Sequence, residues 1–278
     1  TAGDLGAAFA ITYQNRNLFK GSEVFNLQLR GAYEAIRGLE GYKNQDFIEY
    51  SVESSLSFPR IIAPKFLTNI IGNRYDARSE VSVMYDLQNR PEYHRRVLSM
   101  AWKYKWSNEG HHDRYQIDLL DINYLFMPWI SDTFRKDYLE DDTNRNAILR
   151  YNYENLLIMK WGVGYNYNNG RYAIKANVET SGNLLNLCSG LLNFEKNEQG
   201  QYQVFGIAYA QYAKADFDFT NNISFDYNNQ LIFHVGFGIA YPYGNSTILP
   251  FEKRYFSGGA NSVRGWSVRE LGPGKFKG

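Results

Sequence analysis

The chain has 278 residues, a length that fits one or two domains, and its 30 Lys and Arg residues nearly balance its 29 Asp and Glu residues. This balance excludes the basic excess that is typical of nucleic-acid-binding proteins, so we expect no nucleic-acid partner. The single cysteine excludes a disulfide framework and a multi-cysteine zinc site within the chain. Aromatic residues reach 17% although the mean hydropathy is only −0.48, and no apolar run approaches the ~18 residues of a transmembrane helix. A polar chain that is this rich in Tyr and Phe is typical of a β-protein.

Apolar residues alternate with polar or small residues along much of the chain. Successive side chains of a β-strand point to opposite faces, so each alternating segment predicts a strand with one apolar face. We count ten or eleven strands, although strands between residues 126 and 156 cannot be placed from the pattern. The clearest segments, in chain order, are residues 5–13, 25–33, 48–58, 81–87, 94–106, 172–178, 205–217 and 231–241.

The length of these segments separates two β architectures. They run for 7 to 13 residues, whereas strands of soluble domains are mostly about 5–6 residues long. A tilted strand needs ~9–11 residues to cross a bilayer, and Tyr and Trp at segment ends, such as Tyr13, Trp106 and Tyr241, fit an aromatic girdle. The sequence therefore predicts an all-β fold, an antiparallel transmembrane β-barrel, with a large soluble β-sandwich as the alternative. In residues 231–241, Val235 and Phe237 should face lipid, and His234 and Gly236 the lumen.

The connections between the predicted strands alternate in length. Short ones are rich in turn-forming residues, as in Asn15-Arg16-Asn17, Asn89-Arg90-Pro91 and Asn168-Asn169-Gly170. Longer ones cover residues 59–76, 127–150 and 183–200. Within the second of these, Ser131 is placed to cap a short amphipathic helix.

Several polar groups resemble catalytic or metal sites, but each has a simpler interpretation. A solvated loop explains His111-His112, because adjacent residues of an extended chain face apart. The acidic residues within 137–142 lack calcium-loop spacing. Cys188 has no neighbouring base, and a polar lumen wall explains Asp216 and Asp218. We therefore expect no enzyme, no metal site and no cofactor.

Residues 250–274 break the alternation and combine aromatic residues, glycines and arginines in one connection. Long structured loops of compact folds are usually functional. Gly258-Gly259 allows a close approach of the backbone to a wall. Arg264, followed by Gly265 and Trp266, is a planar donor at a loop tip. It would need an acidic partner if the loop entered the lumen, and it would be solvated if the loop lay on the surface.

This segment resembles the lid loop of the outer-membrane protein assembly superfamily, the BamA, TamA and chloroplast Toc barrels. The matching residues are Pro250-Phe251-Glu252, Gly258-Gly259 and Val263-Arg264-Gly265-Trp266. In that family they belong to the sixth extracellular loop of a sixteen-stranded barrel. Residues 5–13 resemble the first strand of the family, and Asn17-Leu18-Phe19 its first hairpin turn.

The resemblance implies that residues 1–278 are part of a barrel in the bacterial outer membrane. On this view the chain ends in the lid loop, residues 244–278, while the periplasmic domains and the last strands are absent. Arg264 would lie in the lumen against acidic residues of strands beyond the sixth loop. The family inserts unfolded outer-membrane protein clients into the surrounding lipid by lateral opening beside its first strand. We expect that seam strand to include Leu5, Ala7, Phe9 and Ile11.

The branch of the family and the function have alternatives. Trp266, Arg269 and Gly272-Pro273-Gly274 resemble the Bacteroidota TamA relative called TamL, which implies a TamB-type periplasm-spanning protein as a further partner. A two-partner secretion translocator also combines a barrel with an arginine-bearing loop. A passive diffusion porin would need no such loop. An enzyme embedded in a barrel would need a nucleophile arrangement that the sequence does not offer.

Overall fold

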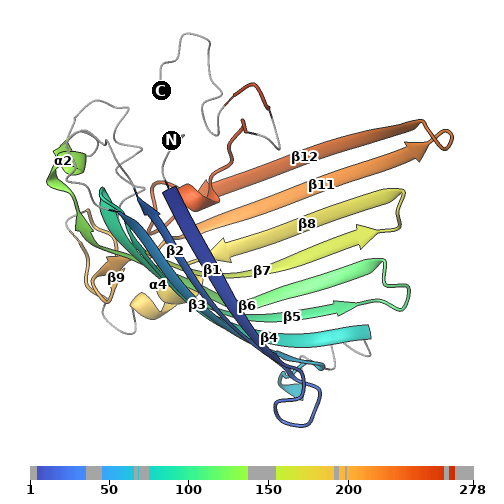
Figure 1. The fold of residues 1–278 in the computed structure, drawn as a ribbon, viewed down its shortest axis with the longest axis horizontal. Coiled ribbons are helices and arrows are strands. Elements are labelled where there is room, and N and C mark those ends of the chain that lie inside the picture. Colours follow the sequence, from blue (N-terminus) through green and yellow to red (C-terminus); the bar gives the residue numbers. More distant parts are fainter. Residues whose placement is uncertain are drawn as a thin grey trace.

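The fold is a single curled antiparallel sheet of ten strands (Figure 1). The computed structural model describes residues 5–35, 46–65, 68, 75–136, 155–190, 194–197, 199–259 and 263–266. Within these residues the hydrogen-bonded order is β1-β2-β3-β4-β5-β6-β7-β8-β11-β12, so β1 and β12 form the two free edges of a sheet that is not closed. The strands are β1 (Leu5–Asn15), β2 (Val24–Ala35), β3 (Phe47–Phe58), β4 (Tyr75–Asn89), β5 (Tyr93–Ser107), β6 (Asp113–Ile130), β7 (Leu156–Asn168), β8 (Tyr172–Ser181), β11 (Tyr212–Ser224) and β12 (Gln230–Pro242).

The alternating pattern sets the two faces of this sheet. On β12, the side chains of Val235 and Phe237 are 60% and 66% exposed, and Phe237 pairs across to Phe217 of β11. Gly238, the residue after Phe237, pairs with Asp216, and both lie on the opposite face. We call the face that carries Asp216 the inner face, because the lid loop contacts it, and the apolar face the outer face. The faces predicted for β12 agree with this division, since Val235 and Phe237 lie on the outer face and Gly236 lies on the inner face.

The turns at one end of the sheet form as their Asn residues predict. The Asn15 side chain accepts a hydrogen bond from the Asn17 amide at 3.0 Å, and Asn168 accepts one from Gly170 at 2.9 Å. Such side-chain turns close a hairpin without help from tertiary contacts. Figure 1 shows the β5–β6, β7–β8 and β11–β12 turns together at this end, which we call the hairpin end.

The opposite end, which we call the lid end, carries the connections that follow β6 and β8 and the start of the lid loop. It holds α2 (Asp132–Phe134), α4 (Asn183–Ser189), the small hairpin of β9 (Gln203–Val204) and β10 (Ile207–Ala208), and the 3-10 helix η2 (Phe251–Lys253) (Figure 1). A small core of Leu157, Ile207 and Tyr209 forms beneath the hairpin. The helix predicted after Ser131 is a single turn in the described residues, without a capping hydrogen bond from the Ser131 side chain. None of the described helices is long and apolar enough to cross a membrane.

Three strands differ from the sequence-based prediction, and one of them, β7, is not among the clear segments. The strand predicted over 205–217 is wrong at its start, because Phe205 and Gly206 both have positive φ (53° and 75°) and form the two-residue turn between β9 and β10. Strand β6 was not among the clear segments because bulges interrupt its alternation. Its register shifts against β7 between Asp118 and Asp121, and against β5 opposite Trp102/Lys103. An extra residue at a bulge reverses the face of every later side chain.

Candidate functional site

The described part of the lid loop, residues 244–259 and 263–266, begins directly after β12 and returns to the inner face of the sheet. Pro250 precedes η2, and the Lys253 amide donates a hydrogen bond to the Pro250 carbonyl at 2.9 Å. This turn presents Glu252, Lys253 and Tyr255 as three successive anchors. Together the three anchors contact β5, β8, β11 and β12.

The first anchor joins the lid loop to β5. The Arg95 Nη2 and Glu252 Oε1 atoms lie 2.5 Å apart, and the two residues are 157 positions apart in the sequence. The Glu252 side chain is 51% exposed, so water screens this ion pair and its contribution is modest. The main contribution of this ion pair is positional, because a charged hydrogen bond has a defined geometry and holds Glu252 of the loop over β5.

The second anchor is Lys253, whose ammonium lies 3.4 Å from the Glu179 carboxylate on β8. Glu179 also accepts hydrogen bonds from Lys160 at 3.1 Å and from the Tyr212 hydroxyl at 3.1 Å. Lys160 continues the chain of charges to Asp121 at 3.4 Å and to Asp118 at 3.9 Å. Burial, and then the neighbouring Lys160 ammonium, lower the pKa of Lys253, while Glu179 opposes that shift.

These charges form one cluster on the inner face, which we call the inner charge cluster. Its members are Lys103, Lys160, Lys253, Asp118, Asp121 and Glu179. The sheet alone supplies three carboxylates and two ammonium groups, and Lys253 of the lid loop supplies the third. The cluster is therefore neutral only when the lid loop is docked. Partly buried charges are costly unless they are paired, so the cluster favours the docked loop.

The third anchor is Tyr255, which lies against β11 and β12. Its hydroxyl donates to the Asp216 carboxylate and also lies 3.2 Å from the Ala215 carbonyl oxygen. Lys214 Nζ lies 4.3 Å from the centre of its ring. The ring fills the space that Gly238 leaves on the inner face, since an added Cβ there would lie 2.5 Å from the ring. Burial and the Asp216 hydrogen bond raise the pKa of Tyr255.

The glycines and the arginine turn of the lid loop follow these anchors. Gly258 and Gly259 have φ values of 100° and 89°, which other residues adopt only with strain. The Gly259 amide donates to the Trp266 carbonyl at 2.8 Å, and the Trp266 amide donates to the Val263 carbonyl at 3.1 Å. These two bonds close the Val263-Arg264-Gly265-Trp266 motif into a turn. All four residues of the turn are exposed, and the role of Arg264 stays a prediction.

The other polar groups singled out in the sequence are engaged separately. His111 pairs with Asp76 at 3.2 Å, whereas His112 contacts the Asn168 carbonyl at 3.0 Å, so the two imidazoles do not converge. Asp218 lies 3.1 Å from His234. Cys188 is a free thiol in α4. The acidic residues 137–142 lie outside the described residues, and the described part of the chain holds no cluster of three metal-ligating side chains.

The predicted seam strand is an edge strand. In β1, Leu5, Phe9 and Ile11 are 80%, 58% and 61% exposed, and β1 pairs only with β2 in the described sheet. Sequence reasoning missed the anchors Arg95, Lys253 and Tyr255. The available signal was indirect: Gly238 leaves a gap on the inner face opposite Asp216, and a gap of that kind admits an aromatic ring.

The fold and the site are those of a membrane β-barrel protein. Its antiparallel sheet has an exposed apolar outer face, and a loop is docked on its inner face. A profile of the Omp85 superfamily domain matches residues 133–277, just over half of the chain. The chain belongs to the Omp85 superfamily. Proteins of this superfamily are bacterial outer-membrane proteins that insert or secrete other proteins without enzymatic chemistry. None of the curated protein sequences matches the chain.

Proposed function

We propose that this chain forms most of the barrel of an outer-membrane protein insertion factor. The observation that carries the proposal is the lid loop on the inner face, held by Arg95–Glu252, Lys253–Glu179 and the Tyr255 hydroxyl. A passive porin keeps its lumen open, and a loop anchored at three points across it argues against that alternative. No cofactor enters the proposal.

The proposed mechanism is strand augmentation at a lateral seam. The free edges of β1 and β12 present backbone N–H and C=O groups, and in hydrocarbon each unpaired group costs several kcal/mol. In the complete barrel both edges must therefore be paired. A client strand can enter where that pairing is weakest, by adding its own backbone hydrogen bonds to the exposed edge. The small residues Gly6, Ala7, Ala8 and Ala10 pack weakly and suit an edge close to such a seam.

We infer the position of β1 relative to the seam from the strand count. Ten antiparallel strands place the start of β1 and the lid loop at the same end of the sheet. The described connections at that end make the lid loop the fifth, after those that follow β2, β4, β6 and β8. If it is the sixth extracellular loop of the barrel, one more strand pairs with the free edge of β1. We therefore propose that Leu5, Ala7, Phe9 and Ile11 support the seam from the second strand, rather than border it as the sequence suggested.

The finer identity is also a proposal. The residues around Trp266 favour the TamL branch, with a TamB-type periplasm-spanning protein, outer-membrane lipid and unfolded barrel proteins as partners. A two-partner secretion translocator is the competing function. It differs in exporting one dedicated substrate instead of inserting many clients.

The test is a depletion strain complemented by variants of the complete protein. Arg264→Ala should lower the amounts of several unrelated outer-membrane clients while its own abundance in the outer membrane stays normal. Arg264→Lys should rescue poorly, because a point charge cannot replace a planar bidentate donor. A control is Arg16→Ala, which removes an arginine at the hairpin end, far from the lid loop.

Two results would decide against the insertion factor. Normal client levels with Arg264→Ala at full abundance would remove the lid loop from the mechanism. Loss of a single secreted substrate, with all membrane clients unaffected, would instead establish the translocator.

A disulfide that locks the two sides of the seam should inhibit insertion as well, since it prevents opening.

A further inference from the structure

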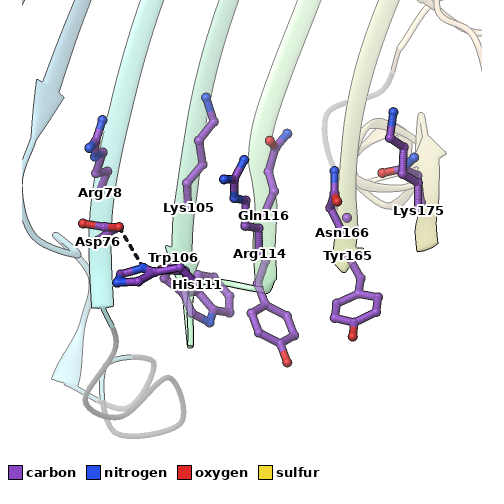
Figure 2. Close-up of a pocket in the computed structure, with 14 residues that line it drawn as sticks. Asp76, Arg78, Lys105, Trp106, His111, Arg114, Gln116, Tyr165, Asn166 and Lys175 are labelled. Carbon is purple, nitrogen blue, oxygen red and sulfur yellow. Dashed lines mark hydrogen bonds and ion pairs between the residues drawn. The ribbon is translucent and has the colours of Figure 1, made fainter. Parts of the chain in front are cut away.

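A hollow of about 710 Å³ lies at the hairpin end of the sheet, away from the lid loop and the inner charge cluster. Strands β4 to β8 supply its lining (Figure 2). Gly164 of β7 lines the hollow between Gln116 of β6 and Asn177 of β8, in the same cross-strand row. A Cβ at Gly164 would lie 2.9 Å from the Asn177 side-chain oxygen, so a larger residue would fill part of the hollow. The glycine keeps this part of the wall recessed.

Four cations surround the hollow: Arg78, Lys105, Arg114 and Lys175. Figure 2 shows their side chains projecting the same way from β4, β5, β6 and β8. Lys105 lies two residues after Lys103, and Lys175 lies four residues before Glu179. Because both spacings are even and the registers are regular there, each pair shares the inner face. We call these four residues the basic mouth site.

Most of this positive charge is not neutralised by the protein. Lys105 pairs with Glu80 at 2.8 Å, and Asp76, which also lines the hollow, pairs with His111. Within the described residues, Arg78, Arg114 and Lys175 have no carboxylate within ion-pair distance. Asp218 is the cross-strand neighbour of Lys175, but it contacts His234 instead. All three unpaired cations are exposed. The inner charge cluster, in contrast, has a partner for every charge.

The spacing of the cations selects the kind of anion that fits. Neighbouring strands lie ~4.8 Å apart, so the four steps from β4 to β8 span about 19 Å. A single phosphate or carboxylate cannot reach across this distance. An extended polypeptide rises ~3.3 Å per residue and places alternate side chains ~6.6 Å apart on one face. Four acidic side chains at alternate positions span ~20 Å, which matches the width of the site. Gln116, Asn166 and Asn177 add amide groups for the peptide backbone.

We propose that the basic mouth site binds an extended acidic segment of an unfolded client polypeptide. This inference rests on the proposed function, and it adds which segments of the client polypeptide the site binds, namely acidic ones. The attraction between exposed charges decreases steeply with distance in salt, because the screening length is about 8 Å at physiological ionic strength. Binding at this site is therefore a weak, salt-sensitive first contact, which suits a segment that must move on to the seam.

The experiment measures peptide binding to the complete detergent-solubilised protein by fluorescence anisotropy. The probe is a labelled peptide of about eight residues with Glu at alternate positions, ~26 Å long when extended, and its control has Gln in place of Glu. The Glu peptide should bind at least about tenfold more tightly than the Gln peptide, with the difference shrinking as salt rises. The triple variant Arg78→Gln, Arg114→Gln, Lys175→Gln should weaken Glu-peptide binding about tenfold or more. The matched variant Arg171→Gln removes a cation at the same end, outside the hollow, and should bind normally.

The outcomes that would overturn the proposal are separate from those of the proposed function. Equal binding of the two peptides, or unchanged binding by the triple variant, would show that the site does not recognise acidic segments. Tighter binding of inorganic tripolyphosphate, with displacement of the Glu peptide, would assign the site to phosphate-bearing ligands instead. Arg114→Gln alone, which changes one exposed residue, serves if the triple variant fails to fold, and should give a smaller loss in the same direction. The proposed function is decided by client levels in the lid-loop variants, which keep all four cations.

Discussion

Replacing Gly238 by alanine should release the lid loop from the sheet. The new Cβ would lie 2.5 Å from the Tyr255 ring, far inside van der Waals contact, so the ring must move. The backbone of β12 itself accepts alanine, since Gly238 is not among the glycines with positive φ. The perturbation therefore acts on the contact between sheet and loop.

The size of the effect follows from what Tyr255 loses. Its hydrogen bond to the Asp216 carboxylate is charge-assisted, but the residue is 47% exposed, so we take ~1 kcal/mol rather than the full value for a buried bond. The Lys214 contact with the ring adds ~0.5–1 kcal/mol at an exposed site. The sum of about 1.5–2 kcal/mol corresponds to a roughly 10- to 30-fold rise in the undocked population.

Native-state proteolysis measures that population directly. Trypsin cleaves after Lys253 and Arg254, whose side chains are engaged with Glu179 and with the Leu249 carbonyl when the lid loop is docked. Cleavage of a transiently opened segment follows the equilibrium between open and closed forms when closing is fast. The rate of cleavage at these two sites should therefore rise about 10- to 30-fold in Gly238→Ala.

The matched control is Gly236→Ala, two residues earlier on the same face. There the added Cβ would meet only the Asp218 carboxylate oxygen, at 3.0 Å, and this side chain can rotate away. The control should cleave at the wild-type rate. Equal acceleration by both variants, or none by Gly238→Ala, would refute the view that Tyr255 holds the loop through the gap at Gly238.

Three further predictions test the anchors and the faces. Arg95→Glu should increase lid-loop proteolysis a few-fold, in line with ~0.5–1 kcal/mol for a solvated pair, and adding Glu252→Arg should restore the wild-type rate if the pair acts through charge. Because docking raises the pKa of Tyr255, its contribution is complete below the ordinary pKa of ~10 and is lost as the pH rises further, so cleavage by an alkali-stable protease should accelerate there in wild type but not in Tyr255→Phe. In lipid, Val235→Arg on the outer face should lower the free energy of unfolding in urea by ~2–4 kcal/mol, whereas His234→Arg on the inner face should cost less, and the reverse order would show that the faces are misassigned.

The sequence alone predicted most of the strands and their faces, and it indicated a candidate functional loop. Alternation predicted β1, β3 and β12 because one face of each strand is apolar, and that requirement acts residue by residue. Asn168 and Gly170 predicted their turn because the interaction is local. The motif from Pro250 to Trp266 indicated a candidate functional segment because it breaks the alternation. The superfamily match includes this segment.

The tertiary structure alone decided what that loop contacts. Bulges in β6 shift its register, and positive φ at Phe205 turns a predicted strand into a hairpin, and neither is visible in composition or period. The partners Arg95 and Glu252 lie 157 residues apart, and Lys253 finds Glu179 only because successive registers from β5 to β12 place both on one face. The same registers place four cations around the hollow, and among the described residues three of them have no carboxylate within ion-pair distance. Local sequence fixes the direction of each side chain, but the sum of many strand registers fixes which side chains meet.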